Sequence, residues 1–355
     1  MLYVCYPYLD VIPESAVEFY KKLYLTLYSR HDKIKNFNRD KYTSISAYNA
    51  NYIFDALCFN SLNKGDLEFN DASLTKHISD ALRLNSIDID ENENVKKDII
   101  NVTCLIQKDG YDKYVYLHKS IQEFHAAQFI SNLPHEHKNK FYRKLSEIIE
   151  REDKFDNVIF FLKEIDTKDY ESLLIMNTLE KYNFQHLSTS NQEQIVTSFI
   201  DHALSKAQIS FTKSAIDNEE YARISGYSSI SYGTVFSVMN MFLGNHRFTN
   251  NPVEQALSDS MRNIRKRSKA NIGFETISPE QLESMNAEKT TRDFDGESIV
   301  LYTIPMDVYL ENMGELGILK RKIESFTLDF YTNRYLPVSK KLLEVSSILD
   351  IDFNM

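Results

Sequence analysis

The sequence is poor in residues that interrupt helices, with only nine glycines and seven prolines among 355 residues. This composition predicts long helices joined by few tight turns. Tryptophan is absent, so the aromatic part of the core must come from 22 tyrosines and 22 phenylalanines. The three cysteines, Cys5, Cys58 and Cys104, are widely spaced in apolar surroundings. Their odd number favours buried thiols in a reducing cytoplasm over a disulfide framework or a zinc site.

Other absences exclude whole classes of protein. No apolar run approaches the roughly 20 residues that cross a bilayer, and residues 1–11 lack the basic start of a signal peptide. We therefore expect a cytoplasmic protein without a membrane partner. The formal net charge of −10 argues against general affinity for nucleic acids.

Catalytic and cofactor motifs are also missing. The sequence contains no Gly-x-x-x-x-Gly-Lys-[Ser/Thr], the loop that holds the phosphates of ATP. No Ser-His-Asp, Cys-His or paired-carboxylate set has the spacing of a catalytic motif. His135 and His137 fall in a predicted polar loop without a further Cys or His cluster, which favours a solvated loop over a metal site. We expect no catalytic residues, no metal and no cofactor in this chain, and hence no enzyme.

The most informative segment joins a short strand to a helix. Residues 114–117 are aromatic and β-branched, as strands prefer. Ser120 stands three residues before Glu123, the spacing of a reciprocal cap at a helix start. His118 is then placed just before a helix N-terminus, where backbone donors favour anions, and could point at a phosphate. The alternative is a buried histidine bonded to a neighbouring carbonyl.

The residues before this segment predict a winged-helix domain. Apolar helices are expected at 52–59 and 74–84, with a third ending at 98–102. Residues 104–117 then read as a β-hairpin, because Asp-Gly between two β-prone runs favours a tight turn. Many such domains bind DNA, but the region 88–97 is mostly acidic, whereas a recognition helix should be basic.

Residues 117–127, Leu-His-Lys-Ser-Ile-Gln-Glu-Phe-His-Ala-Ala, resemble the end of the winged-helix domain of NACHT-type STAND NTPases. In that family the histidine at this place reaches the phosphates of the bound nucleotide and holds the closed, ADP-bound state. The resemblance gives this role to His118. The motif positions that match are Ser120, Gln122, Glu123 and Phe124, whereas His125 replaces an aromatic or aliphatic residue.

Residues 12–32 similarly resemble the last part of the helical domain that precedes the winged helix. In the family a P-loop ATPase domain comes before that segment, and ATP or ADP is implied only together with that domain. The chain therefore looks like the carboxy-terminal half of such a protein, as a natural short product or as a cut piece. The implied partner is a P-loop NTPase domain, in cis or in trans.

Together these patterns predict a mainly α-helical protein in four parts. The end of a STAND helical domain is expected at 1–44, the winged helix at 45–131, a helical bundle or solenoid-like domain at 132–204, and a mostly helical, sensor-like domain with a small β element at 205–355. In the last part a strand is expected at residues 297–304, closed by Pro305, with helices at 308–330 and 339–349.

One basic run stands out in this last part: Arg262, Arg265, Lys266, Arg267 and Lys269. It could meet an acidic partner protein or nucleic acid. The alternative is a solvated helix face.

The resemblance implies a regulatory function in bacterial antiphage immunity, in which the chain holds an autoinhibited state and recognises a trigger, such as a phage protein. Two alternatives stay open: a free-standing short relative that regulates a full-length NTPase, and a winged-helix nucleic-acid-binding protein.

Overall fold

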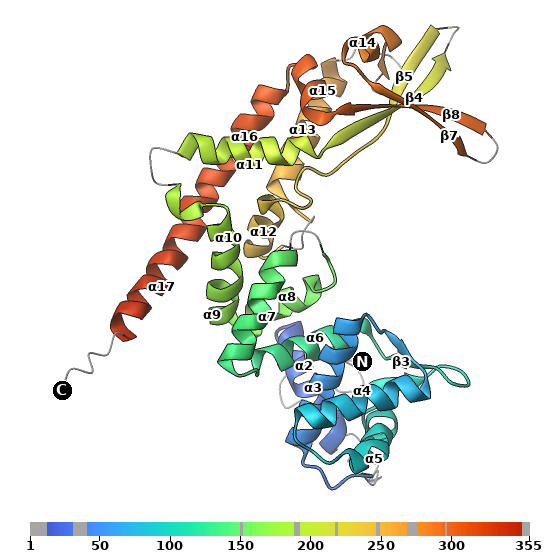
Figure 1. Ribbon diagram of the computed structural model, residues 1–355, viewed down its shortest axis with the longest axis vertical. Helices are drawn as coiled ribbons and strands as arrows, with labels where there is room; N and C mark the ends of the chain where they lie inside the picture. Colours follow the sequence, from blue (N-terminus) through green and yellow to red (C-terminus); the bar gives the residue numbers. More distant parts are fainter. Residues whose placement is uncertain are drawn as a thin grey trace. The chain divides into compact units, whose positions relative to one another are not determined.

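The computed structural model describes residues 13–30, 41–149, 152–187, 192–216, 219–245, 249–267, 276–294 and 297–349. The chain forms two compact units (Figure 1). Unit 1 comprises residues 1–145 and 152–173, and unit 2 comprises residues 146–151 and 174–355. The described chain is mainly helical with two small antiparallel sheets, as predicted.

A three-stranded sheet and the helices around it form the segment of unit 1 from residue 47 to residue 131. Its elements are α3 (Ala47–Lys64), β1 (Glu68–Phe69), α4 (Asp71–Leu84), η3 (Ile89–Glu91), α5 (Asn92–Lys97), η4 (Asp98–Thr103), β2 (Ile106–Lys108), β3 (Tyr114–Tyr116) and α6 (Lys119–Ser131). The strands pair antiparallel in the order β1-β3-β2. Three helices followed by a hairpin were predicted, and the turn contains Gly110 at φ +101°, a conformation that glycine adopts without strain.

Local capping explains where the first two of these helices begin. Ser46 accepts a hydrogen bond from the Asn49 amide at the start of α3. Asn70 and Ser73 form a reciprocal capping box at the start of α4. Each cap satisfies amide donors that have no partner within the helix, which favours a helix start at that residue.

The remaining helices of unit 1 are α2 (Ala16–Arg30), α7 (His135–Ile148, which ends in unit 2), α8 (Asp156–Ile165) and α9 (Thr167–Asp169). An aromatic cluster joins α2, α6 and α8. The Tyr20 ring stacks on Phe124 with centroids 5.2 Å apart, and both rings contact Phe161 edge-on. His135 and His137 lie in the first turn of α7 and not in a loop, so the loop prediction was wrong there.

Unit 2 contains helices on a five-stranded antiparallel sheet of order β6-β5-β4-β8-β7 (Figure 1). The strands are β4 (Gln208–Ile216), β5 (Glu219–Tyr227), β6 (Thr276–Ile277), β7 (Glu288–Phe294) and β8 (Glu297–Pro305). The helical elements are η5 (Tyr170–Met176, which begins in unit 1), α10 (Asn177–Lys181), η6 (Phe184–His186), α11 (Gln192–Ser205), α12 (Val235–Phe242), α13 (Pro252–Arg267), α14 (Pro279–Ser284), α15 (Met306–Asn312), α16 (Leu316–Phe330), η7 (Tyr331–Tyr335) and α17 (Leu336–Leu349).

The predicted strand at 297–304 is confirmed as β8, but the hairpin of β4 and β5 was not predicted. The buried side chains of β4, Ile209 and Phe211, alternate with polar residues. Such a strand carries no continuous apolar run, so its composition resembles that of a loop.

The two predicted C-terminal helices also differ from the observed ones. The expected helix at 308–330 divides into α15 and α16 at Gly314, whose φ is +69°. The last helix begins before Pro337 and not after it. The Leu336 amide donates to the Tyr331 carbonyl in a wide π-type turn, which places the proline, without an amide of its own, in the first turn of α17.

Asp98 anchors α2 and the segment before α3. This buried carboxylate accepts hydrogen bonds from the Tyr28 hydroxyl at 3.1 Å, the Thr43 hydroxyl at 2.8 Å and the Tyr42 amide at 2.8 Å.

Asp98→Ala removes the acceptor for all three donors, and we expect the free energy of unfolding to fall by about 1–3 kcal/mol. Asp90→Ala, at an exposed aspartate in the same region, should change it by less than about 0.5 kcal/mol. Equal denaturant midpoints for the two variants would contradict this role of Asp98.

Candidate functional site

His118 lies between the central strand β3 and α6, with extended backbone angles φ −155° and ψ 140°. Its side chain is exposed, and its Nδ1 accepts a hydrogen bond from the Ser120 amide at 3.2 Å. The predicted place before a helix N-terminus is confirmed. The alternative of a buried histidine bonded to a carbonyl is wrong for this residue.

The predicted cap of Ser120 and Glu123 is also wrong, because His118 itself caps α6. The helix begins at Lys119, so Ser120 lies in its first turn, where its hydroxyl contacts His118 Nδ1 and accepts from the Tyr20 hydroxyl. Glu123 is buried and pairs with Lys119 Nζ at 3.3 Å. The Asn157 amide also donates to the Glu123 carboxylate. Sequence rules for caps favour Ser, Thr, Asp and Asn, and therefore missed a histidine in this role.

The other residues of the motif point into the core of unit 1. Phe124 lies in the aromatic cluster, and the buried Gln122 amide donates to Ser61 Oγ and to the Asp66 carbonyl, both at 2.9 Å. His125 Nδ1 and Asp55 Oδ1 are 2.6 Å apart, and both side chains are buried. Burial raises the pKa of Asp55, and the hydrogen bond from His125 opposes that rise. These residues fix α6 against α3, whereas His118 faces solvent.

The geometry of His118 defines the chemistry that it offers. Because Nδ1 accepts the Ser120 amide, the neutral ring carries its proton on Nε2. The Ile121 amide bonds to the His118 carbonyl, so two of the first amides of α6 are already occupied. His118 can therefore donate one hydrogen bond to an external acceptor such as a phosphate oxygen.

The described residues of the predicted basic run, Arg262, Arg265, Lys266 and Arg267, lie on the last turns of α13 and differ in their contacts. Arg262 pairs with Asp259 at 3.1 Å, whereas Lys266 is exposed. Arg267 donates to the Met313 carbonyl at 2.9 Å and to Glu315 Oε1 at 2.7 Å. The Glu315 side chain is only 1% exposed, so Arg267 neutralises a buried charge. Lys269 lies outside the described residues.

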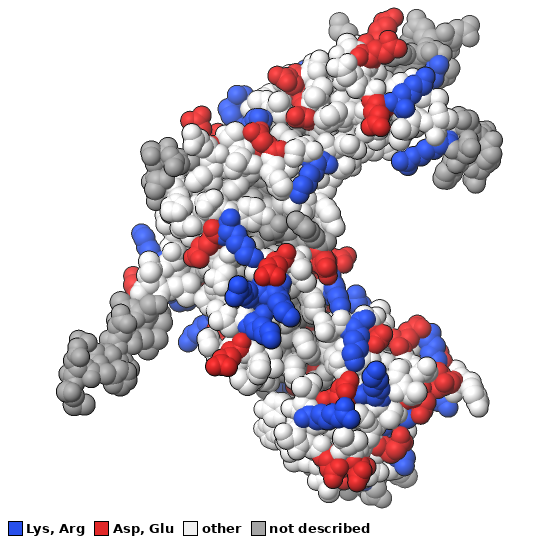
Figure 2. Space-filling model, in the orientation of Figure 1, with Lys and Arg blue, Asp and Glu red and all other residues white. Residues whose placement is uncertain are grey.

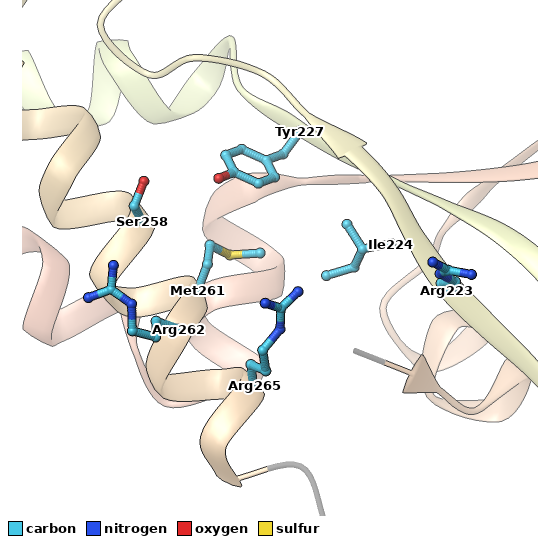
Figure 3. Close-up of a pocket in the computed structure, with 7 residues that line it drawn as sticks. All are labelled: Arg223, Ile224, Tyr227, Ser258, Met261, Arg262 and Arg265. Atoms are coloured by element: carbon cyan, nitrogen blue, oxygen red, sulfur yellow. The ribbon is translucent and has the colours of Figure 1, made fainter. Parts of the chain in front are cut away.

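Two arginines of the run, Arg262 and Arg265, line a cavity between α13 and β5 (Figure 3). The cavity has a volume of about 300 Å³. Its other lining residues are Arg223, Ile224, Tyr227, Ser258 and Met261. Arg223 and Tyr227 were not predicted from the sequence, because they belong to β5, a strand without a clear sequence signal.

Other predicted features can be placed among the described residues. In these ranges no group of three His, Cys, Asp or Glu side chains is placed to hold a metal, and no helix is both long and apolar enough to cross a membrane. Cys58 is buried, which raises the pKa of its thiol, whereas Cys104 is only half-buried. Cys5 lies outside the described residues. Acidic and basic side chains are interspersed on the face shown in Figure 2.

The second half of the chain matches a known protein family. Residues 164–353 match the family described as Short NACHT-associated C-Terminal domain, family 1. The matched segment includes most of the predicted sensor-like domain and the end of the predicted helical domain before it. The match confirms the association with NACHT proteins that the motif implied. No curated protein and no solved structure matches the chain.

Arg267 and its neighbour Lys266 give a matched pair of tests. Arg267→Ala leaves the buried Glu315 carboxylate without its cation, and we expect the free energy of unfolding to fall by about 1–3 kcal/mol. Lys266→Ala removes an exposed charge and should change it by less than about 0.5 kcal/mol. Chemical unfolding of both variants measures the difference. If Arg267→Ala is as stable as Lys266→Ala, the ion pair does not contribute to stability.

Proposed function

This chain belongs to the family Short NACHT-associated C-Terminal domain, family 1, and we propose that it is the regulatory and sensing part of a NACHT-type NTPase in bacterial antiphage immunity. The observation that carries the proposal is the family match over residues 164–353. The winged-helix order and the motif at residues 117–127 support it independently, because they lie outside the matched segment.

In this proposal unit 1 holds the resting state. The partner is a P-loop NTPase domain, in cis or in trans, which binds ADP. The exposed Nε2 of His118 donates to a phosphate oxygen of that nucleotide, and the buried pair of His125 and Asp55 keeps α6 in place while it does so. The chain contributes no catalytic residue, since its sequence contains no phosphate-binding loop.

Recognition of the trigger is assigned to the C-terminal domain at residues 205–355. The support is that the arginine-lined cavity belongs to this part of the chain. By contrast, the motif residues of unit 1 other than His118 are committed to helix packing.

The winged helix offers little support for DNA binding. Its third helix, α5, is short and follows the acidic η3. The Lys96 ammonium on α5 is mostly buried and pairs with Asp71 at 2.6 Å, so it is not available for a phosphate backbone.

Substitution of His118 tests the resting-state role in a complete NACHT protein. His118→Leu removes both the cap of α6 and the Nε2 donor, and His118→Asn keeps a capping side chain but loses that donor. We expect both variants to raise basal activity without trigger. Each loses a hydrogen bond that stabilises the ADP-bound resting state relative to the active state, so more of the protein becomes active. The measurement is basal signalling of the complete protein beside thermal melts of the isolated chain.

A purely structural role of His118 predicts a different pattern. Only His118→Leu would then change the protein, through a loss of about 0.5–2 kcal/mol of stability from the missing cap, and basal activity would stay at the wild-type level in both variants. That result would contradict the nucleotide role.

The isolated chain should neither hydrolyse ATP nor bind ATP or ADP in the micromolar range. The reason is that His118 supplies one hydrogen bond and no phosphate loop accompanies it. Titration calorimetry and a phosphate-release assay on the pure chain measure both properties. Micromolar affinity for either nucleotide would contradict the assignment of catalysis to a separate domain.

A further inference from the structure

The strand wall of the cavity is shaped by a β-bulge in β5. Ile224 pairs with Phe211 of β4, and Gly226 pairs with the next residue, Ser210, so Ser225 is the extra residue. A bulge shifts the alternation of side chains by one position. Tyr227 therefore lies on the same face of the sheet as Ile224, and both line the cavity (Figure 3).

The helix wall comes from a single face of α13. Ser258, Met261, Arg262 and Arg265 recur at the spacing of one helical stripe. Met261 is buried and forms an apolar floor, whereas both arginines are exposed. In Figure 3 the side chains of Tyr227, from the strand, and Arg265, from the helix, lie on opposite sides of the Met261 side chain.

Hydrogen bonds connect α13 to the loop that follows β5. Glu254, near the start of α13, accepts three hydrogen bonds from the loop that follows Tyr227. The donors are the Ser229 hydroxyl at 2.5 Å, the Ser231 amide at 2.8 Å and the Ser231 hydroxyl at 2.7 Å. These bonds tie one end of the strand wall to the helix wall without a ligand, and such preorganisation lowers the entropic cost of binding.

The composition of the walls indicates the class of ligand. Arginine guanidinium groups bind planar oxyanions with two parallel hydrogen bonds. The ring of Tyr227, 46% exposed, and the side chains of Ile224 and Met261 add an apolar surface beside them. The ligand should therefore carry an anionic group next to an apolar one.

A carboxylate suits this cavity better than a polyphosphate chain. Asp259 lies 3.1 Å from Arg262 and reduces the local positive charge. The whole chain carries a formal charge of −10, which repels a polyanion such as nucleic acid over longer range. An acidic protein segment has fewer charges, separated by apolar side chains. It is therefore repelled less than a polyanion, both by Asp259 and by the net negative charge of the chain.

We propose that the cavity between β5 and α13 binds an acidic segment of a partner protein. Its aspartate or glutamate carboxylates bind Arg262 and Arg265, and an adjacent apolar side chain packs between Tyr227 and Met261. This inference names the chemistry of the trigger and rests on the proposed sensing function for its biological role, whereas the binding itself can be tested without it.

The test is a selection of random displayed peptides on the intact chain. The selected peptides are then synthesised, and their affinity for the chain is measured by fluorescence anisotropy. We expect the selected peptides to contain Asp or Glu beside an apolar residue, and we expect their affinity to fall with added salt. Arg265→Glu should weaken binding about tenfold or more, and so should Tyr227→Ala, which leaves all charges in place. Lys266→Glu is the matched control, because it makes the same charge change one residue away, outside the cavity lining. It should change affinity by less than about threefold.

Three results would overturn the proposal. The selected peptides could lack acidic residues, or they could bind Arg265→Glu and Lys266→Glu equally. ADP or a single-stranded oligonucleotide could also displace them. Thermal melts of each variant show that the fold is kept. The same variants in a complete NACHT protein separate this inference from the proposed function. If a variant loses peptide binding but its response to the trigger is unchanged, the cavity is a peptide-binding site and the sensing role is contradicted.

Discussion

The buried contact between His125 on α6 and Asp55 on α3 is the interaction on which unit 1 depends. Their side chains are 1–2% exposed and 2.6 Å apart. Removing one partner of such a pair leaves an uncompensated polar group in the core, which disfavours any placement of α6 on α3 that separates the two side chains. Because β3 is the central strand and α6 follows it after only two residues, Leu117 and His118, this placement also fixes His118. The exposed imidazole of His118 is therefore held at the edge of a packed core.

Position and role could be predicted to different degrees at this junction. The strand, the histidine and the helix are visible in the sequence, because β-prone residues give way to an apolar helical stripe within a few positions. The cap could not be assigned, since Ser120 and Glu123 satisfy the common rule and the imidazole of His118 is a rarer acceptor. His125 looked like a departure from the family motif, but its partner Asp55 lies far away in the sequence, where no local pattern connects the two.

Unit 2 was less predictable for a related reason. Strand β4 buries Ile209 and Phe211 between polar residues, and among the described side chains of β5 only Ala222 is buried, so neither strand carries an apolar run. The bulge at Ser225 depends on the register between two strands and leaves no signal in either alone. The basic run on α13 was visible, but only tertiary structure separates Arg267, which neutralises Glu315, from Arg262 and Arg265, which line the cavity. Residues of one charge in one run thus lie in different environments.

We assign trigger recognition to the C-terminal domain at residues 205–355, nearly all of which lies within the family segment at residues 164–353. The most direct test exchanges this segment between two complete NACHT proteins of the family that respond to different triggers, with residues before 164 left unchanged. Activation is then measured with each trigger. The account predicts that trigger specificity moves with the exchanged segment. If each chimaera still responds to the trigger of its unchanged amino-terminal part, recognition resides elsewhere and the sensing assignment is wrong.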